Sequence, residues 1–221
     1  MRQMNIFTDA SIMTSKFGET IGCAGAICYE DNNICKYEIL RDSTNNISEI
    51  TAVKLGVLLA LENRHFFDSF NIYADSQWSI FGLTKWIRSW AENTTDGVMY
   101  NSSGVPVKNQ QIFLSIMRLI IDNYLAVNFY HVKGHVNVHD FTSMNNAAKV
   151  FERSNGVHIP RSKTYDIAKM NNLVDRNTRE LLKSEYIYNR EVLNRGIINP
   201  IISNEDLNIY YNLVTLGGNK I

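Results

Sequence analysis

The sequence predicts an α/β domain built on a mixed β-sheet. Segments with strand-like alternation are interleaved with segments of helical periodicity, which is the pattern of such a domain. A turn signal near residue 31 makes the early strands antiparallel, and a helix that follows them returns the next strand parallel to the first. The chain has 221 residues, 45% of them hydrophobic and 20% charged, which is enough for one well-packed core.

The first three strands are predicted from alternation and from one turn. MNIFTDAS (4–11) alternates and then meets polar residues, so we expect a strand that ends near Asp9. IGCAGAICYE (21–30) and ICKYEILRD (34–42) flank Asp31-Asn32-Asn33, and together they predict a hairpin.

A helix and a fourth strand follow the hairpin. SEITAVKLGVLLALENR (48–64) has apolar residues at helical spacing, and Asn46 followed three residues on by Glu49 predicts a capping box at its start. FNIYADS (70–76) reads as a short strand. A right-handed crossover would place Asp9 and Asp75 at the carboxyl ends of neighbouring parallel strands, where open α/β sheets bind ligands.

The rest of the chain adds one strand and several helices. Helical segments are predicted around 77–91 and 107–124, with a polar loop, 92–104, between them. LAVNFYHV (125–132) completes a five-stranded sheet flanked by helices. We expect two further helices, at 143–154 and 167–184.

These segments suggest one domain with two elaborations. We assign residues 1–184 to the domain, including a helical insertion at about 140–170, and residues 185–221 to a C-terminal extension. We expect the protein to be monomeric.

Composition excludes several classes of protein. The 22 basic and 22 acidic residues give no net charge, so a nucleic-acid partner would have to be held by a local patch or by metal ions. The sequence contains no secretion signal and no membrane-spanning stretch, and its three cysteines lack the pairing of a zinc site or a disulfide framework. We therefore expect a cytoplasmic protein, in a host cytoplasm if the source is viral, without a membrane partner.

Four acidic residues are candidates for one metal site. Asp9 shares a strand face with Phe7, and Asp75 shares one with Tyr73. Each acid alone has an ordinary structural explanation, such as a strand-end turn or a helix cap, or for Asp175 an i,i+4 pair with Arg179. If all four converge, however, they cannot all stay ionised without cations, and oxygen ligands of this kind suit Mg²⁺ or Mn²⁺. The four residues are Asp9, Glu49, Asp75 and Asp175.

Six short motifs give the sequence a family resemblance. FTDAS, STNNISE, YADSQW, PVKNQ, YHVKGH and NNLVDRNTREL occur in this order, and from residue 4 to about 183 the chain resembles the bacterial type 1 ribonucleases H (RNase HI-like). The resemblance implies a ribonuclease H-like fold. It also implies a two-metal-ion endonuclease that hydrolyses the RNA strand of RNA/DNA hybrids, leaves 5′-phosphate and 3′-hydroxyl ends, and acts in DNA replication.

The resemblance also implies roles for individual residues. Asp9 would bridge two Mg²⁺ ions (Mn²⁺ being possible), Glu49 and Asp75 would complete one, and Asp175 would complete the other. The implied substrate-binding residues are Ser11, Asn45, Asn46 and Gln77. Amides beside metal-binding acids are suitable neutral readers of 2′-hydroxyls, although Asn45-Asn46 could instead be a loop and helix cap.

Three histidines in HVKGHVNVHD (131–140) have the four-residue spacing of a zinc site on a helix. The segment 125–132 alternates as a strand, and Gly134 ends it. The histidines are therefore not on one helix, and their four-residue spacing does not bring them together. We therefore expect His131 to be structural and His139 to lie where the insertion begins. His135 is expected near the carboxylates, as a catalytic proton shuttle and not as a metal ligand.

The chain departs from the family in several places, and two of them concern how the hybrid is held. In the family a basic "handle" grips the hybrid, but here the handle segment (residues 89–108) contains Lys108 as its only basic residue. Trp86 and Trp90 resemble the aromatic part of that region, although core packing is the favoured interpretation for both.

The second departure is the insertion, where five basic and three acidic residues give a balance of plus two over 140–170. One hypothesis is that its Lys149 and Arg153 replace the handle; the simpler alternative is a helical elaboration with a solvated face. The insertion also makes Asp140 or Asp166 an alternative to Asp175 as the fourth acid. We favour Asp175, because Asn171 precedes it by four residues as in the family.

Two other functions remain open from the sequence. The chain could be a non-catalytic hybrid-binding domain, or another nuclease of the same superfamily such as a junction resolvase. Metal-dependent cleavage of a labelled hybrid would distinguish these functions.

Overall fold

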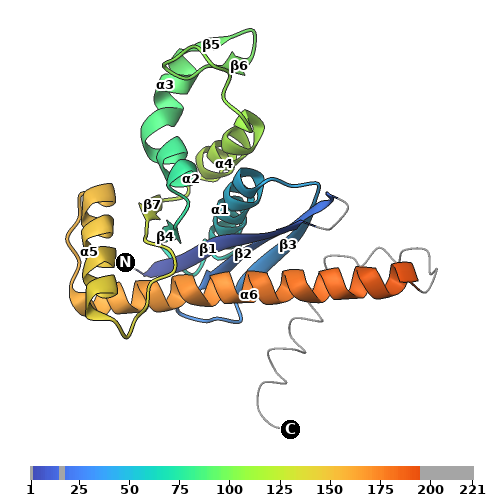
Figure 1. Cartoon of the computed structure of the whole chain (residues 1–221). Helices are drawn as coiled ribbons and strands as arrows, with labels where there is room; N and C mark the ends of the chain where they lie inside the picture. Colours follow the sequence, from blue (N-terminus) through green and yellow to red (C-terminus); the bar gives the residue numbers. More distant parts are fainter. Residues whose placement is uncertain (1, 15–17, 195–221) are drawn as a thin grey trace.

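A computed structural model of the chain describes residues 2–14 and 18–194, with side chains placed as far as residue 186 (Figure 1). Within these residues five strands form one sheet in the order β3–β2–β1–β4–β7. The strands are β1 (Gln3–Thr14), β2 (Thr20–Cys28), β3 (Cys35–Arg41), β4 (Ser69–Ala74) and β7 (Val127–His131). Strand β1 is antiparallel to β2 and parallel to β4, which confirms the predicted mixed sheet.

Helices cover both faces of this sheet (Figure 1). Helix α1 (Asn45–Glu62) packs on one face, and the long α6 (Arg161–Asn194) crosses the other against β1 and β2. Helix α5 (Phe141–Asn155) lies beside β7 and the start of α6. The chain between β4 and β7 forms α2 (Gln77–Phe81), the π-helical turn η1 (Gly82–Trp86), α3 (Ile87–Glu92), the short strands β5 (Thr94–Thr95) and β6 (Val98–Met99), and α4 (Gln110–Asp122).

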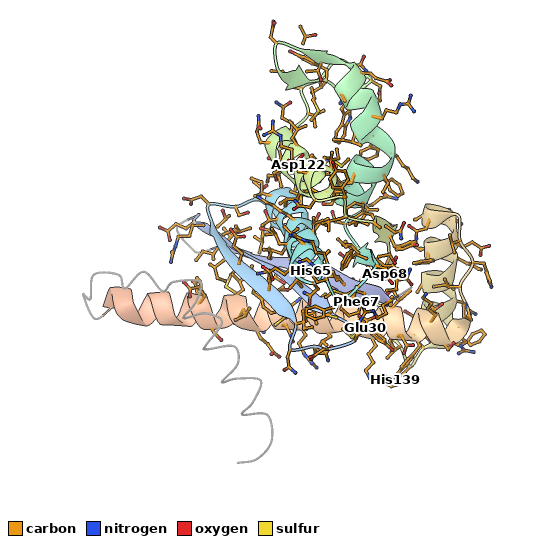
Figure 2. All side chains as sticks on the ribbon, turned by 180° about the vertical axis from the view of Figure 1, so that it is seen from behind. Glu30, His65, Phe67, Asp68, Asp122 and His139 are labelled. Carbon is orange, nitrogen blue, oxygen red and sulfur yellow. The ribbon has the colours of Figure 1, made fainter. Side chains whose placement is uncertain are left out.

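The alternation of β1 divides the core into two layers, which are filled with side chains (Figure 2). Ile6 and Thr8 face α1, where a Cβ on Gly56 would lie 2.8 Å from the Thr8 Cγ2 atom. This close approach explains why the middle of α1 holds a residue that disfavours helices. Phe7 faces α6 and stacks on Tyr73 of β4 at 4.7 Å between ring centroids. Residues of β1 with odd numbers therefore face α6.

The start of α1 differs from its prediction. Its N-cap is Thr44, whose side chain accepts a hydrogen bond from the Ile47 backbone, so the predicted Asn46–Glu49 capping box is wrong. Thr44 stands two residues before the predicted cap, Asn46, and supplies the side-chain oxygen that an N-cap requires. Glu49 is consequently not needed to cap the helix.

Strand β1 is also longer than predicted. It continues to Thr14, because β2 pairs with it residue by residue from Ile6 to Thr14. Its parallel pairing with β4 ends at Thr8, however. Asp9 therefore lies within a strand, at the point where one of its two neighbouring strands stops.

Helix α6 is longer than the predicted helix at 167–184. It begins at Arg161, so the insertion at 140–170 consists of α5 and the first part of α6, and it continues past residue 184 to Asn194. The proposed domain boundary at 184 thus falls inside a helix. Of the C-terminal extension, residues 195–221 lie outside the described residues.

The handle segment contains a small hairpin in place of the predicted loop. Strands β5 and β6 pair within it, and α4 follows. Trp90 is buried and meets the Phe113 ring edge-on at 5.2 Å, as expected for a core residue, whereas Trp86 is 37% exposed. No helix in residues 2–14 and 18–194 combines the length and apolar character needed to cross a bilayer.

Candidate functional site

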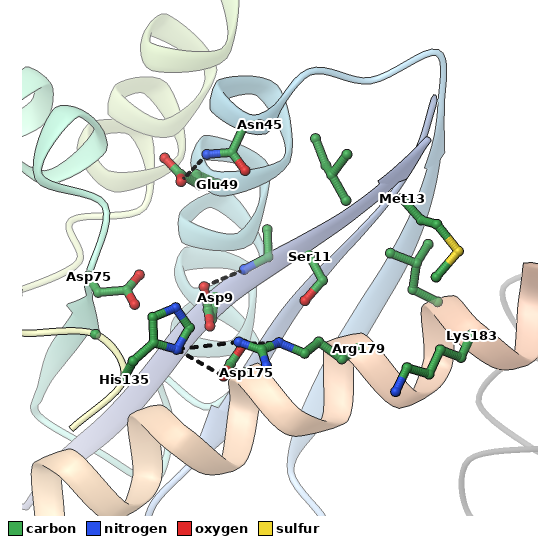
Figure 3. Close-up of a pocket in the computed structure, with 14 residues that line it drawn as sticks. Asp9, Ser11, Met13, Asn45, Glu49, Asp75, His135, Asp175, Arg179 and Lys183 are labelled. Atoms are coloured by element: carbon green, nitrogen blue, oxygen red, sulfur yellow. Dashed lines mark hydrogen bonds and ion pairs between the residues drawn. The ribbon is translucent and has the colours of Figure 1, made fainter. Parts of the chain in front are cut away.

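A pocket of about 660 Å³ opens between β1, the start of α1 and the middle of α6 (Figure 3). All four predicted metal-binding acids line it, together with the predicted proton shuttle. These residues are Asp9, Glu49, Asp75, Asp175 and His135. Asp9 belongs to β1, Asp75 directly follows β4, Glu49 and Asp175 belong to helices, and His135 belongs to a loop. Up to 166 residues (175 minus 9) separate them in the sequence.

Asp9 and Asp75 form the floor of the pocket. Asp9 is only 9% exposed, and its Oδ1 atom accepts a hydrogen bond from the Ala10 backbone at 2.7 Å. Asp75 directly follows β4, and its Oδ2 atom accepts one from the Asn171 side chain at 3.3 Å. The end of β4 one residue before Asp75 leaves space beside Asp9, so the two carboxylates face the same opening.

Asp175 extends from α6 toward the other acids. Its Oδ1 atom lies 2.8 Å from Nε of Arg179, one helical turn further on, and its Oδ2 atom lies 3.5 Å from Nδ1 of His135. The i,i+4 pair with Arg179 that the sequence suggested is therefore real. It does not remove Asp175 from the pocket, where its side chain is 15% exposed.

Glu49 reaches the pocket from the first turns of α1. One of its carboxylate oxygens accepts from the Asn45 side chain and the other from the Ser76 hydroxyl. Ser76 in turn caps α2 by accepting from the Ser79 backbone. The carboxylate is thus oriented by two neutral hydrogen-bond donors.

The donor set fits a divalent cation. Burial, and then the nearby Asp75 carboxylate, raise the pKa of Asp9 to about 8, and burial raises the pKa of Asp75 as well. A raised pKa means that a carboxyl group keeps its proton, which relieves the repulsion between the two acids. A bound cation would relieve the same repulsion. The Asn171 Oδ1 atom, next to Asp75, is buried without a hydrogen-bond partner in the described part of the chain, which leaves an oxygen acceptor at the site. As they stand, no three His, Cys, Asp or Glu side chains among residues 2–14 and 18–186 are close enough to hold one ion alone.

The loop that carries His135 is fixed by α5 and α6. Asn172 of α6 donates to the Val136 carbonyl at 2.7 Å, and Ser143 of α5 accepts from the Asn137 backbone at 3.0 Å. Val136 is buried with Met144 and other apolar residues of α5 and α6. His135 itself has a left-handed backbone, with φ of 52°, and its side chain is 71% exposed. The backbone is thus held firmly while the imidazole stays accessible.

The three histidines lie in three different environments. His131 is buried in β7 and its Nδ1 atom pairs with the Ser154 hydroxyl at 2.9 Å, while His139 is exposed in the turn before α5 (Figure 2). The histidines lie in a strand and in the loop after it, so they do not share a helix face, as expected from the alternation before Gly134. Of the three, His135 alone lines the pocket.

The predicted substrate-binding residues divide into two pairs. Ser11 and Asn45 line the pocket, although the Ser11 hydroxyl is also paired with Thr178 of α6 at 2.9 Å. Asn46 and Gln77 are exposed and lie outside the lining. For Asn46 and Gln77, substrate binding therefore stays a prediction.

Two pocket residues were missed as functional candidates. Arg179 and Lys183 both line the pocket from α6. The spacing Asp175, Arg179, Lys183 was a usable signal, because residues four apart lie along one side of a helix. The alternative fourth acids are elsewhere: Asp140 caps α5 by accepting from the Ser143 backbone, and neither it nor Asp166 lines the pocket.

Comparison with known families and proteins defines the class of protein. The RNase H family matches residues 1–154 of this chain. Ribonuclease HI of Haemophilus influenzae is 31% identical over 134 residues, which cover 61% of this chain and 79% of that protein. The ribonuclease H of Clostridium botulinum is 30% identical over 137 residues, covering 61% and 85%. The chain therefore belongs to the RNase H family, which confirms the resemblance of its motifs.

Solved structures give a weaker likeness. The solution structure of the PFV RNase H domain matches with a TM-score of 0.48 and 20% identity, over 72% of this chain and 97% of that domain. The family match ends at residue 154, before Asp175. The assignment of the fourth acid therefore depends on the position of Asp175 in the pocket.

Replacing His135 should separate turnover from metal binding. We expect His135→Ala to lower kcat by about 10-fold or more, because an accessible imidazole beside the acids can move protons, while Mg²⁺ affinity changes by less than about twofold. Titration calorimetry with Mg²⁺ and single-turnover cleavage would measure the two effects. His139→Ala, four residues away and outside the pocket, is the matched control. An equal loss in both variants, or a large loss of Mg²⁺ affinity in His135→Ala, would contradict the assigned role.

Proposed function

We propose that this protein is an endonuclease that hydrolyses the RNA strand of RNA/DNA hybrids with the help of two divalent metal ions. The observation that carries the proposal is the convergence of Asp9, Glu49, Asp75 and Asp175 on one pocket in a chain of the RNase H family. Members of this family generally use a divalent metal. Relatives named ribonuclease HI and ribonuclease H support the same activity.

The four acids would hold the ions, Mg²⁺ in the first instance and Mn²⁺ as a substitute. When bound, the ions supply activation of the attacking water and stabilisation of charge on the leaving oxygen. Water adds across the bond between phosphorus and the 3′-oxygen, so the products are a 5′-phosphate and a 3′-hydroxyl.

The chain's own residues contribute orientation and proton transfer. Asn45 and Ser76 hold the Glu49 carboxylate, and Asn171 holds that of Asp75. Fixed carboxylates of this kind need no reorganisation during the reaction. His135 is exposed enough to exchange protons with solvent and stands 3.5 Å from Asp175. We assign it the transfer of a proton between the reacting centre and water.

Substrate selection would depend on the rim of the pocket. Asn45 and Ser11 supply neutral donors and acceptors there, and we propose that they contact the hybrid, with Asn46 and Gln77 further out. The 2′-hydroxyl is the group that distinguishes RNA from DNA, and amides and hydroxyls can both bind it.

The test is cleavage of a labelled hybrid. Full-length protein with Mg²⁺ should cut the RNA strand of an RNA/DNA duplex, leave 5′-phosphate ends, and lose this activity in EDTA. Double-stranded DNA and a four-way DNA junction should stay intact. No metal-dependent cleavage in Mg²⁺ or Mn²⁺ would show a non-catalytic hybrid-binding domain, and cutting of the junction alone would show a resolvase.

A further inference from the structure

The pocket extends well beyond the four acids. Its far half runs along β1 and α6 and is lined by Ile12, Met13, Leu182 and Lys183 (Figure 3). None of these residues is needed to hold a metal ion or to transfer a proton. This half of the pocket is therefore available for a part of the substrate away from the reacting bond.

Helix α6 presents a regular series of charges to the pocket. Asp175, Arg179 and Lys183 are four residues apart, and in Figure 3 they follow one another along the helix. Four residues advance a helix by about 6 Å, a step similar to the one between neighbouring phosphates of a nucleic-acid strand. The series begins with an acid at the reaction centre and continues with two cations.

The two cations differ in how far their charge is already neutralised. Arg179 is paired with Asp175 at 2.8 Å, so most of its charge is offset within the protein. Lys183 is exposed, and in the part of the chain that the structure describes it has no ion pair. Lys183 is thus a pocket-lining cation whose charge is not offset by an ion pair in the described residues, and its neighbours in the lining, Ile12, Met13 and Leu182, carry no charge.

The other candidate basic surfaces are less suited to hold the substrate. In and near the handle segment, Arg88 is paired with Glu92 at 3.0 Å, and Lys85 lies over the Phe81 ring. Lys149 and Arg153 of the insertion are exposed on α5, outside the pocket. The structure gives the insertion a different role, since it packs against the loop of His135. Continuity with the acids therefore favours α6.

We propose that Lys183, with Arg179 beside it, forms a subsite for the phosphodiester backbone of the strand being cut, one to two phosphates from the scissile bond. This subsite rests on the proposed function, because it assumes that the strand crosses the four acids. The handle segment has few basic residues to hold the hybrid, and this subsite would supply a phosphate contact from α6 in its place. The apolar wall of Ile12, Met13 and Leu182 would face the sugar edge of the same strand.

The subsite predicts a defined loss of salt-dependent affinity. We measure binding of a fluorescent RNA/DNA hybrid in EDTA, where no cleavage occurs, over a series of salt concentrations. One lost phosphate contact should make the slope of log affinity against log salt less steep by about 0.7–0.9. Lys183→Ala should show this change. Lys169→Ala, an exposed lysine on the same helix about 21 Å before Lys183 and outside the pocket, should not.

A substrate with one neutral linkage tests the position of the contact. A methylphosphonate placed in turn at each of the three linkages on either side of the cut should weaken wild-type binding at one or two of them. At those linkages the methylphosphonate should not weaken hybrid binding by Lys183→Ala any further. An unchanged slope in Lys183→Ala, an equal change in Lys169→Ala, or no linkage that loses its effect in Lys183→Ala would overturn the subsite. Binding in EDTA is independent of turnover, so a chain that passes this test yet never cleaves would refute the proposed activity alone.

Discussion

Asp9→Asn should abolish metal-dependent cleavage and at the same time stabilise the metal-free protein. We expect activity to fall by at least about 10³-fold, equivalent to about 4 kcal/mol of transition-state stabilisation. Asp9 lies deepest among the acids and faces the repulsion of Asp75, Asp175 and Glu49. Removing its charge removes that repulsion, as expected where function requires a locally unfavourable arrangement. Hybrid cleavage and thermal unfolding in EDTA measure the two effects.

The stability gain should depend on pH with a definite sign. The pKa of Asp9 is raised from its ordinary value of 3.8 to about 8, so between these values the folded chain keeps a proton that the unfolded chain has released. The unfolded state then binds fewer protons, and the free energy of unfolding falls as pH rises through this window. Asp9→Asn should match the wild type near pH 4 and exceed it increasingly up to pH 8. The full difference is at most about 6 kcal/mol, because the shift spans about four pKa units and each unit corresponds to about 1.4 kcal/mol.

Mg²⁺ should reverse the difference in stability between Asp9→Asn and the wild type. The ion stabilises wild-type protein at pH 8 because it replaces the missing proton, and it should have little effect on Asp9→Asn. Asp166→Asn, on α6 but outside the pocket, is the control and should change neither activity nor stability. If Asp9→Asn were less stable than the wild type at pH 8 without metal, the electrostatic account of the pocket would be wrong.

The sheet, and the gathering of most candidate site residues in one pocket, could be predicted from the sequence. Alternation and one hairpin signal predicted the strands, and the crossover rule placed Asp9 and Asp75 on neighbouring strands. Parity along β1 predicted that Asp9 and Phe7 share a face, because the period of a strand is fixed at two. The acids were predictable because their backbone positions follow from secondary structure and topology alone.

Features that depend on packing could not be predicted in the same way. Helix α6 begins at Arg161, six residues before the predicted start, because α6 packs against α5, a contact that no local pattern contains. The N-cap of α1 is Thr44 and not Asn46, and both residues have good capping side chains. Lys183 was missed because its position in the pocket depends on the length of β1 beyond Asp9, which is set by pairing with β2.

The role of Gly134 is another feature that only the folded structure reveals, and Gly134→Ala should disable the enzyme without disturbing its fold. A Cβ at this position would collide with the Asp75 carboxylate, and the three atoms nearest to it all belong to Asp75. The backbone of Gly134 lies outside the left-handed region, so alanine is otherwise acceptable there. The methyl group should push the carboxylate aside by about 1 Å, and a displacement of this size costs about 10²-fold in kcat. Hybrid cleavage under saturating substrate measures the loss.

A double-mutant cycle with Asp75 shows whether the collision is the cause. Gly134→Ala should cost roughly 1–3 kcal/mol of stability in the wild-type background, as overpacking does. In an Asp75→Ala background the colliding carboxylate is gone and only the Cβ atom remains, at 3.3 Å, so the same substitution should cost much less. Equal costs in the two backgrounds would mean that Gly134 is required for another reason. The difference between them measures how firmly Asn171 and the end of β4 hold Asp75 in place, because a loosely held carboxylate would move away at no cost.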